Sequence, residues 1–123
     1  MARVLLVEDD ELLSLLYIKS LEGKGYTLVS AKDGEEGLKI ALDTHPEVVV
    51  LDLNLPKLDG MAVLSKLRQD EWGRSAKVII LTAQEPSDSM LKEILEYSPA
   101  FYLFKSNTSP EELCVKVSEV LRH

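Results

Sequence analysis

Acidic residues directly follow two short apolar runs of this sequence. The run from Val4 to Val7 is followed by three consecutive acids, and the run from Val48 to Leu51 is followed by Asp52. Continuous apolar runs of this length are typical of strands buried on both faces of a parallel sheet. An open parallel sheet carries its binding groups at the carboxyl ends of its strands, although Asp52 alone is equally well explained as the start of a turn. The three acids after the first run are Glu8, Asp9 and Asp10.

Carboxylates gathered at one sheet edge repel one another unless their pKa values rise or a cation lies among them. Mg²⁺ prefers oxygen ligands and is typically held by one or two carboxylates together with phosphate oxygens. Zinc is not indicated, because the only histidines, His45 and His123, lie apart from the acids. We therefore predict a Mg²⁺ site at this edge and interpret Asp10 as a helix N-cap rather than a metal ligand.

Two further apolar runs end in residues that suit phosphoryl chemistry. Thr82 follows the run from Val78 to Leu81, and Lys105 follows the run from Phe101 to Phe104. Each residue by itself is ordinary at a strand end. A metal ion, a carboxylate, a hydroxyl and an ammonium at one edge would together stabilise a phosphoryl group during transfer.

Helical patterns separate the apolar runs. Capping boxes are predicted for Asp33 with Glu36 and for Ser109 with Glu112, and Pro86 is predicted to begin the fourth helix. Strand and helix thus alternate five times, which predicts an α/β fold with a parallel sheet covered on both faces. In the doubly wound strand order 2-1-3-4-5, the first and third strands are neighbours, so their acids meet.

The helix after Asp10 carries more apolar residues than one core-facing stripe needs. The surplus residues are Leu12, Leu15 and Ile18. They indicate either a docking surface for a helical partner or a helix that is buried more broadly than usual. The residues predicted to form the core-facing stripe are Leu13, Leu16, Tyr17 and Leu21.

Length and composition limit the class of protein. A chain of 123 residues with 46% hydrophobic residues predicts one domain over residues 1–123, either free-standing or part of a longer protein. The net charge of -7 argues against direct nucleic-acid binding and against an anionic membrane surface. The single cysteine, Cys114, excludes a disulfide framework, and the first apolar run is too short for a signal peptide or membrane span. We expect a soluble protein of the cytoplasm.

The ordered segments LLVEDD, VVVLDLNLPKLDG, VIILTA and YLFK strongly resemble the receiver domains of two-component response regulators. The resemblance covers essentially the whole chain. It implies a CheY-like, flavodoxin-like fold and a single receiver domain. It also implies a signalling phosphoacceptor that promotes its own phosphorylation and dephosphorylation, rather than an enzyme with a separate substrate.

The resemblance implies a role for each acid. Asp52 is the expected phosphoacceptor, which takes a phosphoryl group from a histidine kinase or a histidine phosphotransfer protein. Asp9, Asp52 and the main-chain carbonyl of Asn54 are the expected Mg²⁺ ligands, and Glu8 is expected to act through a coordinated water. These residues stand at the matching positions of the LLVEDD and VVVLDLNLPKLDG segments.

The resemblance also implies a switch. Thr82 is expected to turn toward the phosphoryl group, Lys105 to contact a phosphoryl oxygen, and Tyr102 to change rotamer in response. The face made by the fourth helix, fifth strand and fifth helix would then bind an output partner or a second copy of the domain.

Three features depart from the family pattern. Ser106 follows Lys105 where proline is usual, the segment between Thr82 and Lys105 is about one residue longer than common, and Phe101 stands where a polar residue is expected. A cis peptide bond before a residue other than proline costs roughly 2.5 to 4 kcal/mol, so we expect a trans bond between Lys105 and Ser106.

Three other functions compete with this interpretation. A flavin or nucleotide binder would need a phosphate-binding loop after the first strand, where acids stand instead. A phosphohydrolase would need a second acid where Asn54 stands. A receiver-like domain that works by binding alone, without phosphorylation, also remains open.

Overall fold

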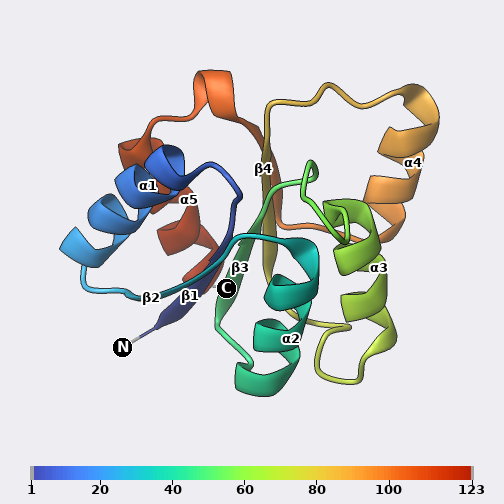
Figure 1. Cartoon of the computed structure of the whole chain (residues 1–123), viewed down its shortest axis with the longest axis horizontal. Helices are drawn as coiled ribbons and strands as arrows, with labels where there is room; N and C mark the ends of the chain where they lie inside the picture. The colour runs from blue at the N-terminus through green and yellow to red at the C-terminus, as the bar shows by residue number, and fades with distance from the viewer. Residues whose placement is uncertain (1, 123) are drawn as a thin grey trace.

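The protein forms a five-stranded parallel sheet in the order β2-β1-β3-β4-β5, as predicted (Figure 1). The structure is a computed structural model that describes residues 2–122; Met1 and His123 lie outside the described residues. The strands are β1 (Arg3–Val7), β2 (Thr27–Ala31), β3 (Val48–Leu51), β4 (Val78–Thr82) and β5 (Phe101–Phe104). The helices are α1 (Glu11–Gly23), α2 (Gly34–Thr44), α3 (Gly60–Gln69), α4 (Asp88–Glu96) and α5 (Pro110–Leu121), with a 3-10 turn η1 (Lys105–Asn107). No helix within residues 2–122 is long and apolar enough to cross a membrane.

Two hydrophobic clusters cover the two faces of the sheet. In Figure 1, α1 and α5 lie on one side of the sheet, and α2 and α3 lie on the other. Alternate residues of one strand enter different clusters: Leu5 packs on the side of α2 and α3, whereas Val4 and Leu6 pack on the side of α1 and α5. The central strands are buried on both faces, which explains their uninterrupted apolar runs.

The helix caps follow the predicted residues with two exceptions. Asp33 caps α2 by accepting from the Glu36 N–H, but the predicted capping box is incomplete, because the Glu36 carboxylate accepts from the Lys32 N–H instead of the Asp33 N–H. The Ser109 side chain accepts from the Glu112 N–H, and the Glu112 carboxylate accepts from the Ser109 N–H, so this capping box is confirmed. The prediction for Pro86 was wrong, because α4 begins at Asp88 and the Ser87 hydroxyl caps it. A serine hydroxyl satisfies an orphan N–H of the first turn, which proline at this point cannot do.

The core-facing stripe of α1 differs from the prediction at Leu16. The stripe is centred on Ser14, Tyr17 and Leu21, which are buried at helical spacing, while Leu13 is partly buried beside them. Leu16 lies two residues from Ser14, about 200° around the helix, and is therefore turned away from the sheet. It joins an exposed apolar patch with Leu12 and Leu15; the three residues are 69% (Leu12), 48% (Leu15) and 47% (Leu16) exposed.

Arg68, which no sequence pattern indicated, links α3 to the segment before β4 and to the segment after α4. The Arg68 guanidinium, at the end of α3, donates to the Gly73 and Ala76 carbonyls at 2.6 and 2.8 Å. It also donates to the Tyr97 and Ser98 carbonyls after α4 at 2.7 and 3.3 Å. Burial lowers the pKa of Arg68, yet these four carbonyls compensate for its lost hydration.

We expect Arg68→Met to lower the free energy of unfolding by about 2 to 4 kcal/mol, because a charge-assisted hydrogen bond contributes roughly 1.5 to 3 kcal/mol and several are lost together. Urea titration followed by circular dichroism measures this change. Lys66→Met on the exposed face of the same helix removes the same charge and should change stability little. Equal effects of the two substitutions would show that Arg68 acts only through its charge.

Candidate functional site

The carboxyl edge of the sheet brings together the three acids that the sequence placed there. β1 and β3 are neighbours with Val7 paired to Leu51, so the residues that follow them leave the sheet side by side. One carboxylate oxygen each from Glu8, Asp9 and Asp52 lies within 4.8 Å of the other two. Asp9 is exposed, whereas Glu8 and Asp52 are buried.

Lys105 makes ion pairs with both buried acids. Its Nζ atom lies 2.6 Å from Glu8 Oε1 and 2.8 Å from Asp52 Oδ2. Burial alone would lower the pKa of the Lys105 ammonium, but hydrogen bonds to Asp52 and Glu8 and their charges raise it above its ordinary value. The Lys105 ammonium therefore contacts the Asp52 carboxylate directly. The described residues contain no cis peptide bond, so the bond to Ser106 is trans, as expected.

Glu8 is held from two sides. Burial raises its pKa, while the hydrogen bond from Lys105 and the N–H of Asp10 oppose this change. Asp10 itself caps α1, because its Oδ1 atom accepts from the Leu13 N–H at 3.0 Å. This confirms the interpretation of Asp10 as an N-cap and leaves Glu8, Asp9 and Asp52 as the acids of the site.

The loop after β3 depends on a glycine. Gly60 begins α3, and a Cβ atom there would lie 2.1 Å from the Asp52 carbonyl oxygen. The Gly60 N–H donates to the Leu53 carbonyl at 2.9 Å, which closes the loop. Asn54 is exposed on this loop, and its N–H donates to Asp52 Oδ1 at 3.2 Å. The backbone therefore orients one Asp52 oxygen while Lys105 binds the other.

Thr82 and Tyr102 are connected through Gln84. Thr82 is fully buried, and its hydroxyl accepts from the Gln84 N–H at 3.3 Å. The Tyr102 hydroxyl donates to the Gln84 carbonyl at 2.9 Å, and its ring lies edge-on to Phe104. Burial raises the pKa of Tyr102, and the charge of Asp52 adds to this. The sequence did not indicate Gln84, because a backbone contact leaves no signature in residue type.

The residues at this edge fit a hard divalent cation. All three acids offer carboxylate oxygens, which Mg²⁺ prefers to nitrogen or sulfur. Three carboxylates and one ammonium leave a net charge of -2 when all four are ionised, which one divalent cation neutralises. Lys105 already binds Glu8 and Asp52, so a cation there competes with its ammonium.

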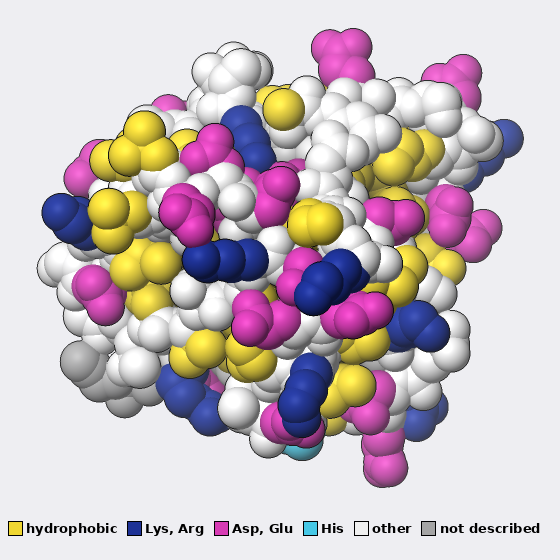
Figure 2. All heavy atoms as spheres, viewed as in Figure 1, with side chains coloured by type: hydrophobic (Ala, Val, Ile, Leu, Met, Phe, Trp, Pro, Cys, Tyr) yellow, Lys and Arg dark blue, Asp and Glu magenta, His cyan; other side chains and the backbone are white. Residues whose placement is uncertain are grey.

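The surface around the acidic edge carries acidic, basic and apolar side chains together (Figure 2). Figure 2 shows acidic and basic side chains interspersed across the centre, with hydrophobic side chains gathered over α1 at the left. The exposed large hydrophobic residues of α1 are Leu12, Leu15 and Leu16. An apolar surface therefore begins beside the acidic edge, because α1 starts directly after it.

Comparisons with known proteins agree with this geometry. The family model for the response regulator receiver domain matches residues 4–118. The chain is 39% identical over 121 residues to the alkaline phosphatase synthesis transcriptional regulatory protein PhoP of Bacillus subtilis, covering 98% of this chain and 48% of PhoP. It is 36% identical over 80 residues to the polar-differentiation response regulator DivK of Brucella ovis, covering 65% of each. The chain thus spans about half the length of some curated relatives.

Solved structures show the same fold. The receiver domain of Francisella response regulator 1452 superimposes with a TM-score of 0.87 at 28% identity, covering 99% of this chain and 98% of that one. The receiver domain of the sensor histidine kinase PA1611 from Pseudomonas aeruginosa, solved with magnesium in its active site cleft, gives a TM-score of 0.87 at 25% identity with the same coverage. The chain belongs to the response regulator receiver domains of two-component systems.

Proposed function

We propose that Asp52 accepts a phosphoryl group from a phosphohistidine donor, and that the phosphorylated domain binds its partners differently. A carboxylate oxygen of Asp52 attacks phosphorus, the bond from phosphorus to the donor imidazole nitrogen breaks, and an acyl phosphate forms. The observation that carries the proposal is the environment of Asp52. Its side chain is 4% exposed, bound to the Lys105 ammonium on one oxygen and close to Glu8 and Asp9.

Each neighbouring side chain has a defined part in this transfer. Lys105 holds the attacking carboxylate in place and then neutralises charge on a phosphoryl oxygen. Asp9, Asp52 and the Asn54 carbonyl would hold Mg²⁺, with Glu8 acting through water. Bound Mg²⁺ would supply positive charge to the transferring phosphoryl oxygens.

The direct test is uptake of phosphate from a small donor such as acetyl phosphate. We expect one base-labile phosphoryl group per chain, with Mg²⁺ present and not with a chelator, as measured by intact-mass spectrometry. Lack of uptake with Mg²⁺ would favour the alternative of a domain that works by binding alone. Tight binding of a flavin or nucleotide would instead support the other alternative on this fold.

The proposed switch uses the Thr82, Gln84 and Tyr102 contacts. A phosphoryl group on Asp52 offers a charged acceptor to the hydrogen of the Thr82 hydroxyl, whose oxygen accepts from the Gln84 N–H. Rotation of the hydroxyl toward the phosphoryl group would weaken its contact with Gln84. Because the Gln84 carbonyl binds Tyr102, movement of this loop changes the surroundings of Tyr102 on the α4, β5 and α5 face. Leu91 and Leu95 of α4 are exposed, which suits an output partner or a second copy.

We expect fluorotyrosine NMR to show a shift of the Tyr102 signal on phosphorylation, because its hydroxyl contact changes. Thr82→Ala should still be phosphorylated but should lose most of this shift, since the hydroxyl that senses the phosphoryl group is absent. Thr44→Ala, at the end of α2, serves as the control. A full Tyr102 shift in Thr82→Ala would contradict the switch.

The apolar patch of α1 is the proposed docking surface for the donor. Leu12, Leu15 and Leu16 lie exposed on the helix that begins beside the acidic edge, so a helix carrying phosphohistidine can dock there and reach Asp52. The predicted surface comprised Leu12, Leu15 and Ile18. Leu16 is exposed beside Leu12 and Leu15 and joins this surface, whereas Ile18 is partly buried.

We expect Leu15→Glu to slow transfer from a phosphorylated histidine phosphotransfer protein by about tenfold or more, because it places a charge in an apolar contact. Uptake from acetyl phosphate should remain unchanged. Leu95→Glu on α4, another exposed leucine away from α1, is the matched control for protein transfer. Equal slowing of both donors by Leu15→Glu would indicate a structural effect instead.

A further inference from the structure

We propose that Tyr17 is a positioning residue for Lys105. Its hydroxyl ties the segment after β5 to α1 and so keeps the Lys105 ammonium directed at Asp52. The inference rests on the proposed phosphoryl transfer for its kinetic consequence. Its structural consequence, the order of the Lys105 side chain, is independent of that function.

Tyr17 is a buried residue whose hydroxyl contacts the segment between β5 and α5. It lies in the core stripe of α1 at 1% exposure, among the largest fully buried side chains. Its hydroxyl donates to the Thr108 carbonyl at 3.3 Å, in a buried setting. A hydrocarbon side chain would fill a core position of α1, whereas a buried tyrosine hydroxyl requires an acceptor, and here that acceptor is the segment that carries Lys105.

The segment between β5 and α5 is short and weakly held by its own backbone. Lys105 begins the single 3-10 turn η1, which has no side-chain cap. The Thr108 N–H lies 3.5 Å from the Lys105 carbonyl, a long distance for a hydrogen bond, and Ser106 and Asn107 are exposed. The contact with Tyr17 therefore supplies a link from this segment to the core.

The position of Tyr17 also places it within the electrostatic field of the site. Burial raises the pKa of its hydroxyl, the charge of Lys105 lowers it, and the charge of Glu8 raises it. α1 begins directly after the acids, so a hydroxyl on α1 fixes the Lys105 segment relative to Glu8 and Asp52 together. The 3.3 Å distance is long for a hydroxyl donor, so the expected effect is graded rather than complete.

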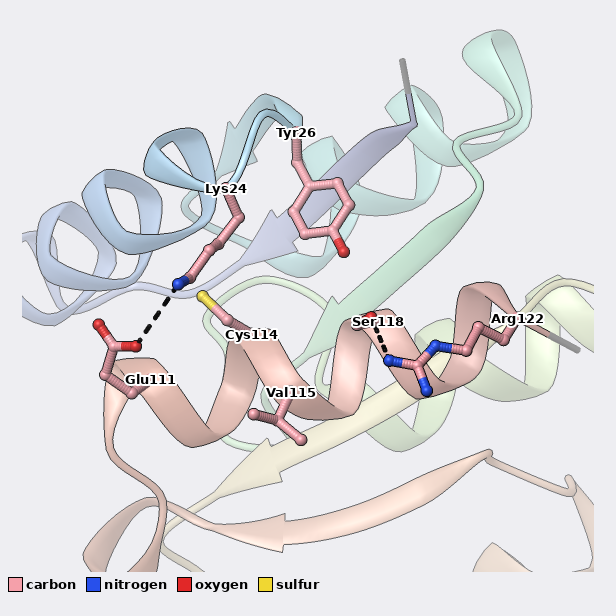
Figure 3. A pocket seen from close by; sticks show the side chains of 7 residues that line it. All are labelled: Lys24, Tyr26, Glu111, Cys114, Val115, Ser118 and Arg122. Carbon is pink, nitrogen blue, oxygen red and sulfur yellow. Dashed lines mark hydrogen bonds and ion pairs between the residues drawn. The ribbon is translucent and has the colours of Figure 1, made fainter.

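The first test compares Tyr17→Phe with Tyr26→Phe. Tyr26 precedes β2, at the sheet edge opposite the acids, and lines a groove of about 370 Å³ between α1 and α5 (Figure 3). Each substitution removes one phenolic hydroxyl. NMR relaxation of the Lys105 Cε methylene should show a lower order parameter in Tyr17→Phe and the unchanged value in Tyr26→Phe. The same order parameter in both variants and the original protein would overturn the proposal.

The second test is a double-mutant cycle with Lys105→Met, measured as the rate of phosphate uptake from acetyl phosphate. Tyr17→Phe should slow uptake about threefold to tenfold when Lys105 is present, as expected for loss of one hydrogen bond. It should have no further effect when Lys105 is absent. Equal slowing in both backgrounds would show a merely structural role and overturn the proposal.

The two tests distinguish failure of the Tyr17 proposal from failure of the proposed phosphoryl transfer. Absence of phosphate uptake by the unmodified protein would refute the proposed phosphoryl transfer, while the order parameter of Lys105 would still decide the role of Tyr17. Normal uptake together with an unchanged order parameter would refute the role of Tyr17 and leave the proposed function intact.

Discussion

Asp52→Asn is expected to abolish formation of the acyl phosphate. The substitution keeps the shape of the side chain but removes the nucleophilic oxygen charge and one charge of the cation site. Glu8 still pairs with Lys105 at 2.6 Å, so the fold should survive. Intact-mass spectrometry after incubation with acetyl phosphate and Mg²⁺ should show no phosphorylated species.

Asp59→Asn is the matched control for this substitution. Asp59 caps α3 a few residues beyond the site, with its Oδ1 atom accepting from the Ala62 N–H, and asparagine caps a helix equally well. This variant should take up phosphate at the original rate. Uptake of base-labile phosphate by Asp52→Asn at the original rate would show that another residue is the acceptor.

Lys105→Met is expected to change two properties in opposite directions. Phosphate uptake should fall by about 100-fold, the typical loss when one preorganised charge-stabilising donor is removed. Affinity for Mg²⁺ should rise severalfold, because Lys105 no longer competes for Glu8 and Asp52. Isothermal titration with Mg²⁺ and single-turnover phosphorylation measure the two effects.

Lys32→Met is the control for loss of a lysine charge near the site. Lys32 pairs with Glu11 at 2.7 Å, but both side chains are exposed, and a surface ion pair contributes little. This variant should leave both measurements nearly unchanged. An unaltered uptake rate in Lys105→Met would refute the role of the ammonium, and weaker Mg²⁺ binding would refute the competition.

Residue type and order predicted the sheet and its acidic edge. Four apolar runs ended in Glu8 with Asp9, in Asp52, in Thr82 and in Lys105, and the structure places these residues at the carboxyl ends of neighbouring strands. The prediction succeeded because a strand buried on both faces must be apolar throughout, so polar chemistry starts abruptly where the strand ends.

The rotation of α1 about its own axis could not be predicted from the spacing of its apolar residues. Two sets of α1 residues fit the spacing of a helical stripe. The predicted set is Leu13, Leu16, Tyr17 and Leu21, whereas the buried set is Ser14, Tyr17 and Leu21. A helix with leucines on several faces does not specify its own rotation. Packing against β2 and α5 decided the rotation of the helix, by burying a serine and exposing Leu16.

The sequence by itself determined the alternation of strands and helices, the strand order and the acids that meet at the sheet edge. The alternation follows from local hydrophobic patterning, which each segment carries alone, whereas the strand order and the meeting of the acids follow from the doubly wound arrangement that this alternation favours. Only the tertiary structure decided which backbone atoms meet side chains from distant elements: Arg68 with the carbonyls after α4, Tyr102 with Gln84, and Tyr17 with Thr108. Every residue offers the same carbonyl and, except proline, the same N–H, so these contacts depend on folded geometry and leave no mark on residue type.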